Sequence, residues 1–372
     1  MNIFGSPSRY YQGRGILNQM GEILNLLGNR FFILADEIVL SLVRDTITDS
    51  MERSGKIPVW EVFRGECSYP EIHRLRSKAG EAGAQVIVGI GGGKAMDTAK
   101  ALGQRLNLPV VIVPTIAASD AASTHVAVIY DENHAKKEVL SMREGVSFIL
   151  VDSEMIAQAP ARFLSAGMGD ALSKKFEAEA CWKSGAKNLF GGKPSFIALR
   201  MGQLAYDIVR EYGEEAKKSV DRKEVSPALE KVIEANLLLS GLVGANGGIA
   251  AAHAIQGGLS IIEEMRLSLH GELVAFGVLV QLILENRESD FINDLIRFYR
   301  LIGLPATLEE LGLSKVNLKE IERAAAKICE SGSYVYNMPF KVNEHVVANA
   351  ILKANCFSKI NPAPTASGGR AG

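Results

Sequence analysis

The segment of this chain with the clearest chemistry is a glycine run that ends in a lysine: Gly91, Gly92, Gly93 and Lys94. It follows an apolar, β-branched run at residues 86–88, which predicts a buried strand of a parallel sheet, and it leads into a predicted helix. Because glycine has no Cβ, a ligand can approach this backbone closely, and the N–H groups at the start of the helix attract negative charge. The run therefore predicts a binding site for the phosphate or pyrophosphate of a nucleotide.

The glycine run matches neither of two common nucleotide-binding motifs. A GxGxxG motif that begins at Gly89 requires glycine where the chain has Lys94, and a Walker loop requires Ser or Thr where it has Ala95. The alternative interpretation is a surface loop whose glycines serve packing alone. In the helix that follows, we expect Asp97 and Lys100 to be solvated side chains rather than ligands.

Two of the six histidines, His253 and His270, stand out as candidate metal ligands. His253 lies in a predicted helix of small residues that covers little of an imidazole, and His270 lies between a charged segment and an apolar helix. They are seventeen positions apart, so we expect them on different helices. Asp170 follows two closely spaced glycines. Spacing alone favours the alternatives: hydrogen-bonded histidines in or near the core, and a helix N-cap for Asp170.

The elements that must position these residues alternate between strands and helices up to about residue 155. Apolar strands are predicted at 30–35, 59–63, 86–88, 108–113, 126–130, 138–141 and 148–151, and helices at 37–53 and 70–82. This alternation indicates a parallel sheet covered by helices. Ligands of such sheets bind beyond the carboxyl ends of the strands, where Asp36, Gly91 and Thr115 lie in this chain.

Beyond residue 155 the pattern becomes helical, with helices predicted at 161–183, 195–212, 227–242, 249–261, 273–286, 290–301 and 319–329. We therefore predict an α/β fold. An N-terminal Rossmann-like parallel-sheet domain spans residues 1–155 and an all-α domain spans residues 156–360. Residues 361–372 are small and turn-forming, which predicts a disordered tail.

Composition excludes several classes of protein. The 372 residues carry a formal net charge of −1, which gives no electrostatic basis for binding nucleic acid or an anionic membrane. The four cysteines are far apart and form no CxxC pair, which indicates reduced thiols. The N-terminus lacks the pattern of a signal peptide, and no uncharged apolar stretch is long enough to span a bilayer. We therefore expect a cytoplasmic enzyme or binding protein.

In its motifs the chain resembles the glycerol dehydrogenases, within the larger superfamily of iron-containing alcohol dehydrogenases and dehydroquinate synthase-like enzymes. The resemblance runs from Asp36 to about residue 355. Its motifs are GGGKAMDTAK at 91–100, PTIAASDA at 114–121, GMGDAL at 167–172, and AAAHAI at 250–255 together with LHGE at 269–272. Each motif alone is weak, but together and in this order they are specific.

The resemblance implies a dehydrogenase that transfers hydride from a zinc-bound polyol or diol to NAD. It implies a metal in the helical domain, zinc or alternatively Fe²⁺ or another divalent ion, held by Asp170, His253 and His270. Asp120 contacts the polyol in the family and completes the catalytic set. NAD lies in the α/β domain, with its pyrophosphate at the glycine run and its adenosine near Asp36, a carboxylate that favours NAD over NADP. The nicotinamide side is expected near Thr115, Ser119, Thr124, Val126 and Tyr130. A homo-oligomer is also implied.

The chain departs from the family near the substrate. Gly244 and Ala245 stand where a Phe and a Glu are usual, Gln256 replaces a common histidine, and His125 replaces a small residue. Either these changes are neutral, or they reshape the pocket, at about 1–3 kcal/mol of substrate discrimination each. In the second case the substrate is a 2-hydroxy or 2-oxo acid, whose carboxylate is received by His125, Lys94 or a metal-bound oxygen.

Two further hypotheses belong to other classes. A lyase acting on a sugar phosphate needs a basic pocket, and although Lys174 and Lys175 follow Asp170, no cluster of Arg or Lys is expected near His253. A non-catalytic nucleotide-binding protein is disfavoured because all three candidate ligands are present. The sequence therefore favours an alcohol or hydroxy-acid dehydrogenase.

Overall fold

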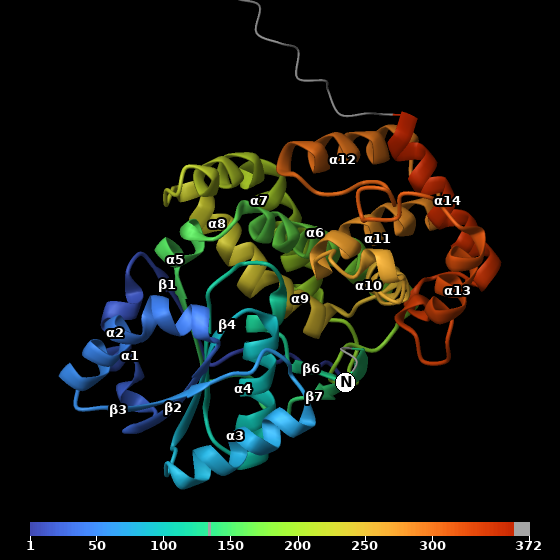
Figure 1. Ribbon diagram of the computed structural model, residues 1–372. Coiled ribbons are helices and arrows are strands. Elements are labelled where there is room, and N and C mark those ends of the chain that lie inside the picture. The colour runs from blue at the N-terminus through green and yellow to red at the C-terminus, as the bar shows by residue number, and fades with distance from the viewer. Residues whose placement is uncertain (133–134, 361–372) are drawn as a thin grey trace, which may run out of the picture.

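The computed structural model describes residues 1–132 and 135–360, and shows a sheet with its helices followed by a helical part (Figure 1). Within these residues, parallel strands form one sheet in the order β1 (Arg9–Gly13), β8 (Phe148–Asp152), β5 (Val110–Pro114), β4 (Val86–Gly91), β2 (Arg30–Ala35) and β3 (Ile57–Val62). The predicted α/β fold is confirmed, and β1 is a strand that the sequence did not predict. The tail predicted at 361–372 lies outside the described residues.

Residues of the central strands alternate between two apolar layers. In β2, Phe31 and Ile33 pack in the layer that contains helix α2 (Glu37–Arg53), whereas Phe32 and Leu34 pack with α3 (Tyr69–Glu81) and α4 (Gly93–Leu106). Burying one such side chain stabilises the fold by about 1.5–3 kcal/mol, which holds helices on both faces. Because β2 is followed by β3 on one side and by β4 on the other, the strand order reverses between β2 and β4. The carboxyl edge at such a reversal is where ligands of this fold bind.

The helical part begins directly after β8. Its helices are α5 (Ser153–Gln158), α6 (Ala161–Ser184), α7 (Phe196–Asp221), α8 (Pro227–Glu234), α9 (Ser240–Gly247), α10 (Ala251–Leu259), α11 (His270–Leu284), α12 (Ser289–Ile302), α13 (Leu318–Ile328) and α14 (Glu344–Ile360). Helix α11 is apolar on all sides and is buried after its first residue, so it forms the centre of this part. The expected division at residue 155 stays a prediction.

The helix predicted at 227–242 is not continuous. A π-helical turn, η4 (Ala235–Leu239), separates α8 from α9, and the helical run then continues to Gly247. From this turn Asn236 Nδ2 donates to the carbonyl oxygens of Ala117 at 3.1 Å and Leu164 at 3.2 Å. Ser123 Oγ donates to Leu237 O at 2.5 Å. The turn thus ties the loop after β5 to the helical part.

Asp97 and Lys100 are not solvated, so that prediction was wrong. Lys100 is fully buried, and its Nζ lies 2.8 Å from Asp97 Oδ1. The ammonium also donates to the carbonyl oxygens of Ala121 at 2.9 Å and Val126 at 2.5 Å. The sequence concealed this because the face of α4 that carries both residues is covered by the hairpin β6 (Val126–Tyr130) and β7 (Lys136–Ser141). Burial raises the pKa of Asp97.

Among the described residues, no single helix combines the length and the apolar composition needed to cross a membrane. One bent pair, Pro227–Gly247 with Ala251–Leu259 at 105°, meets both criteria by length and composition alone.

Candidate functional site

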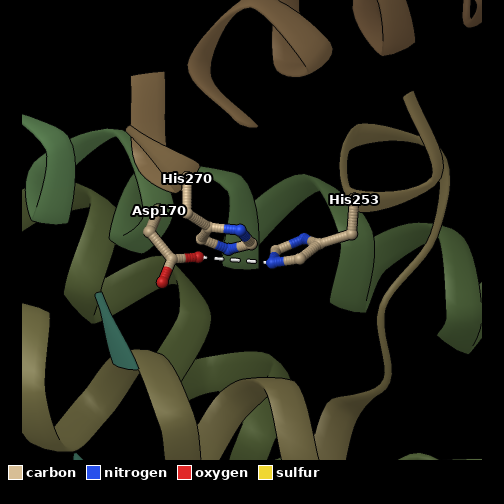
Figure 2. Close-up of side chains that lie close together, drawn as sticks. All are labelled: Asp170, His253 and His270. Atoms are coloured by element: carbon tan, nitrogen blue, oxygen red, sulfur yellow. Dashed lines mark ion pairs between the residues drawn. The ribbon is translucent and has the colours of Figure 1, made fainter. Parts of the chain in front are cut away.

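Three side chains that lie far apart in the sequence meet between helices α6, α10 and α11. Figure 2 shows Asp170 from α6, His253 from α10 and His270, the first residue of α11. One ligand atom from each residue lies within 4.8 Å of the other two. Asp170 lies within helix α6, which excludes the alternative that it caps a helix. The two histidines come from different helices, as the sequence predicted.

Glycines allow α6 and α11 to pack backbone against backbone. A Cβ on Gly271 would lie 1.8 Å from Ala166 O, and one on Gly169 would lie 2.4 Å from Gly271 O. A Cβ on Gly167 would lie 1.9 Å from Ala117 O, in the loop after β5. Only glycine permits these contacts, and they bring Asp170, His270 and that loop together.

A buried carboxylate that the sequence analysis missed orients His253. Glu177 Oε2 accepts a hydrogen bond from His253 Nδ1 at 2.6 Å, because an ionised carboxylate can only accept. Its Oε1 accepts from the backbone N–H groups of Ala250 at 2.8 Å and His253 at 3.0 Å. Nε2 therefore faces Asp170, with 3.3 Å between Nε2 and Asp170 Oδ1. Burial disfavours the imidazolium, yet Glu177 and Asp170 raise the pKa of His253 to about 9.

The other two candidate ligands are held in the forms that metal ions bind. Burial lowers the pKa of His270 to about 4, which leaves its imidazole neutral. Burial opposes ionisation of Asp170, but Lys174 and the two histidines hold the pKa of Asp170 well below its usual range. An ionised carboxylate and two imidazoles suit Zn²⁺ or Fe²⁺ and leave a coordination position open.

Lys174 also lies in the candidate metal centre formed by Asp170, His253 and His270, and the sequence analysis did not place it there. Its Nζ lies 2.9 Å from Asp170 Oδ1, 3.0 Å from Asp120 Oδ2 and 3.2 Å from His253 Nε2, and the side chain is 1% exposed. The sequence analysis expected no cluster of Arg or Lys near His253; the structure brings one lysine, Lys174, into contact with it. Burial opposes the charged form, but the carboxylates of Asp120 and Asp170 raise the pKa of Lys174 above its ordinary value.

Apart from the proton that His253 must release, the surrounding residues fit a divalent metal in every respect except one. The donor set is suitable, and the buried Oδ1 of Asp170 accepts no aligned hydrogen bond. The exception is the ammonium of Lys174, a cation in contact with two of the candidate ligands, Asp170 and His253.

Asp120 belongs to the same centre. It begins the 3₁₀ helix η3 (Asp120–Ala122), and its backbone N–H donates to Asp170 Oδ2 at 3.1 Å. Its carboxylate pairs with Lys174. The loop after β5 thus joins the edge of the sheet to the three candidate ligands.

The predicted nucleotide residues lie at the carboxyl ends of neighbouring strands. Asp36, after β2, caps α2 by accepting from Val39 N at 2.8 Å. Gly91 ends β4 with a φ of 146° that favours glycine, and its carbonyl accepts from Thr115 N at 3.2 Å. Gly92 caps α4 without a side-chain hydrogen bond and Gly93 begins that helix, so no side chain caps the first N–H groups of α4.

The remaining predicted residues line the loop and the hairpin beside this edge. Lys94 Nζ lies 2.8 Å from Glu66 Oε2 and 5.1 Å from the centre of the Tyr130 ring. Burial raises the pKa of Tyr130 to about 12. Ser119 precedes η3, and Thr124 N donates to Asp120 O at 3.1 Å. Val126 begins β6, and its carbonyl accepts from buried Lys100.

One of the positions at which the chain departs from the family, Gly244, faces the centre. A Cβ on Gly244 would lie 3.5 Å from both Asp120 Oδ2 and Lys174 Nζ. His125, by contrast, packs in the core, with its ring centre 4.9 Å from that of Phe190. Burial lowers the pKa of His125, which favours an uncharged ring. Ala245 is buried in α9, and Gln256 lies half-buried in α10.

Comparison with known proteins gives consistent results. A family model described as iron-containing alcohol dehydrogenase matches residues 7–153. The chain is 43% identical to a glycerol dehydrogenase of Thermotoga maritima over 95% of this chain and 97% of the relative. It is 40% identical to a glycerol dehydrogenase of Escherichia coli O6:H1, over 96% and 97%. The crystal structure of glycerol dehydrogenase from Schizosaccharomyces pombe superposes with a TM-score of 0.94 at 35% identity, covering 97% of this chain and 92% of that one.

Proposed function

Because the chain belongs to the glycerol dehydrogenase family of iron-containing alcohol dehydrogenases, we propose that it oxidises glycerol or a related vicinal diol with NAD. The observation that carries the proposal is the convergence of Asp170, His253 and His270, with ligand atoms within 4.8 Å, beside the loop that contains Asp120. That loop leaves the carboxyl edge of the sheet, where a nucleotide is expected.

In the proposed mechanism, Asp170, His253 and His270 hold a divalent metal, for which we propose zinc. When bound, such a metal polarises the substrate hydroxyl and lowers its pKa. Because the pKa of His253 is raised to about 9, its ring must lose one proton before it can bind a metal. Glu177 keeps the remaining proton on Nδ1 through the 2.6 Å hydrogen bond and leaves Nε2 as the ligand atom. Burial keeps His270 neutral, so no proton has to leave its ring at neutral pH.

The carboxyl edge of the sheet binds NAD in this proposal. The N–H groups at the start of α4 receive the pyrophosphate beside Gly91 and Gly93, and Asp36 accepts hydrogen bonds from the adenosine ribose. The nicotinamide lies on the side of Thr115, from which the loop leads directly to Asp120. NAD supplies the hydride chemistry, whereas the protein positions the two reactants.

The charge balance of the centre favours a neutral diol over a hydroxy acid. Three carboxylates, those of Asp120, Asp170 and Glu177, surround one ammonium and two imidazoles. The charge of Lys174 is therefore already matched by carboxylates, so its ammonium is not a spare side-chain cation for a substrate carboxylate. A neutral diol only needs an acceptor for its second hydroxyl, and Asp120 supplies one.

The test is NADH formation by zinc-reconstituted protein on a panel of glycerol, 1,2-propanediol and several 2-hydroxy acids. We expect turnover of glycerol or the diol to exceed that of every acid. Preferential turnover of an acid would refute the charge argument, and silence on all substrates in metal-loaded protein would refute the proposed function. A homo-oligomer and a cytoplasmic location stay predictions from the sequence.

A further inference from the structure

The buried ammonium of Lys174 is the feature of the centre that the proposed mechanism does not use. Lys174 lies on α6, four residues after Asp170. Its Nζ contacts both Asp120 and Asp170, at 3.0 and 2.9 Å, and lies 3.2 Å from His253 Nε2. A lysine that is 1% exposed is stable in its charged form only beside opposite charge, and these carboxylates supply it.

The ammonium uses the same atoms that a divalent metal needs. Asp170 Oδ1 and His253 Nε2 are 3.3 Å apart, a separation that one ion at about 2.0–2.2 Å from each atom can bridge. Nζ of Lys174 already lies about equally close to both of these atoms. A metal bound there would therefore share Asp170 Oδ1 with the ammonium of Lys174, and the two cations would repel each other.

The absence of a side chain at Gly244 is consistent with a lysine in this position. A Cβ at residue 244 would be 3.5 Å from Lys174 Nζ and 3.5 Å from Asp120 Oδ2, so a bulky side chain would extend beside the ammonium. Glycine leaves this space open. Lys174 can then approach Asp120 in the metal-free protein, or withdraw from Asp170 when a metal enters.

We propose that Lys174 is a resident cation of the centre, which competes with the divalent metal for Asp170 and His253 and weakens its binding. In the metal-free protein it keeps Asp120 and Asp170 paired. The proposal rests on the ligand set of the proposed function, but it is independent of which alcohol is oxidised.

The test measures metal affinity and requires no substrate. Metal-stripped full-length protein is titrated with Zn²⁺ against a chromophoric chelator, for the wild type and for Lys174→Met, which keeps the length and removes the charge. We expect Lys174→Met to bind Zn²⁺ about tenfold more tightly or better, which corresponds to about 1.4 kcal/mol. Equal or weaker binding by this variant would overturn the proposal.

Two matched variants separate charge from a general disturbance. Lys175→Met removes the neighbouring lysine, which pairs with Glu179 at 3.0 Å and lies outside the centre, and it is expected to leave Zn²⁺ affinity unchanged. Lys174→Arg retains the positive charge and is expected to bind Zn²⁺ no more tightly than the wild type. Tighter binding by either variant would contradict a charge-based competition.

Thermal unfolding covers the case in which the methionine variant folds poorly without metal. Removing Lys174 leaves Asp120 and Asp170 facing each other without their shared cation, so metal-free Lys174→Met should melt at a lower temperature than the wild type. Zn²⁺ should then raise its melting temperature more than it raises that of the wild type. If only the Zn²⁺-loaded variant can be prepared, its release of Zn²⁺ to a chelator should be slower than that of the wild type, and faster release would overturn the proposal.

Discussion

Replacing Glu177 with glutamine tests whether this carboxylate sets the form in which His253 binds a metal. Glu177 is fully buried, and its two oxygens accept four hydrogen bonds, from Ala250 N, His253 N, His253 Nδ1 and Ser173 Oγ. Glutamine has nearly the same shape but only one acceptor oxygen. If that oxygen stays with the two backbone N–H groups, the amide NH₂ points at Nδ1. Nδ1 must then act as an acceptor, and the ring proton moves to Nε2, where it blocks the ligand atom.

The size of the effect follows from the contacts that are lost. One charge-assisted hydrogen bond of 2.6 Å disappears, and His253 must change its tautomer before it can bind a metal. Changes to such outer partners of a metal-binding histidine typically cost about 10–100-fold in metal affinity or activity. We therefore expect Glu177→Gln to weaken Zn²⁺ binding by that factor, about 1.4–2.8 kcal/mol.

The assay is again a Zn²⁺ competition titration, followed by steady-state kinetics at saturating Zn²⁺. Glu179→Gln is the matched control, since Glu179 is nine residues after Asp170, on the opposite face of α6, and pairs with Lys175 and Arg287, each at 3.0 Å. It is expected to leave Zn²⁺ affinity unchanged. If folded Glu177→Gln bound Zn²⁺ as tightly as the wild type, the tautomer argument would be wrong.

Five further substitutions test separate parts of the molecule. His253→Ala should abolish NADH formation yet leave NAD affinity unchanged in a fluorescence titration, because the metal and NAD are expected at different residues. Gly89→Ala should destabilise the protein to urea by about 1–3 kcal/mol, since its Cβ would meet another methyl carbon at 2.4 Å. Gly80→Ala, which meets nothing within 4 Å in the last turn of α3, should instead stabilise it by up to about 0.5–1 kcal/mol. Asp36→Ser keeps an N-cap and removes the charge, so the ratio of kcat/KM for NADP to that for NAD should rise. Burial lowers the pKa of His125, so the unfolded chain binds a proton at this histidine more readily than the folded chain does. Stability therefore falls as pH drops below about 6.5, the ordinary pKa of histidine. His125→Phe should make this fall in Tm at acid pH less steep.

Much of the α/β part could be predicted from the sequence because its strands are short, apolar and separated by clear breaks. The strand at 30–35 was predicted with its observed bounds and placed Asp36 at its end. The strands predicted at 86–88 and 108–113 likewise placed Gly91 and Thr115 at strand ends. β1 was missed because RYYQG is polar and lies at the edge of the sheet, where one side has no neighbouring strand. The π turn η4 was missed because its residues, ANLLL, continue an ordinary helical pattern.

The centre was harder to predict, because the meeting of three helices is a tertiary property. Spacing alone left Asp170, His253 and His270 unconnected, and only the resemblance grouped them. The helical spacing of residues in α6 nevertheless offered one clue to the centre. Residues four and seven positions after Asp170 share its face of a helix, and these are Lys174 and Glu177. Charged residues on a face that also carries Gly167 cannot all be solvated, because a glycine whose Cβ would meet neighbouring backbone indicates close packing.

The order of charges on this face of α6 allows a decisive comparison. Asp170, Lys174 and Glu177 follow one another as an anion, a cation and an anion, and all three are buried. If they mattered only for packing, removing the charge of either Lys174 or Glu177 would disturb the centre and weaken metal binding in both variants. If their charges act as argued, the two variants differ in sign: Lys174→Met binds Zn²⁺ more tightly than the wild type and Glu177→Gln binds it more weakly. Since a loosened helix cannot raise the affinity of one variant and lower that of the other, opposite signs on one helix face would require an electrostatic cause.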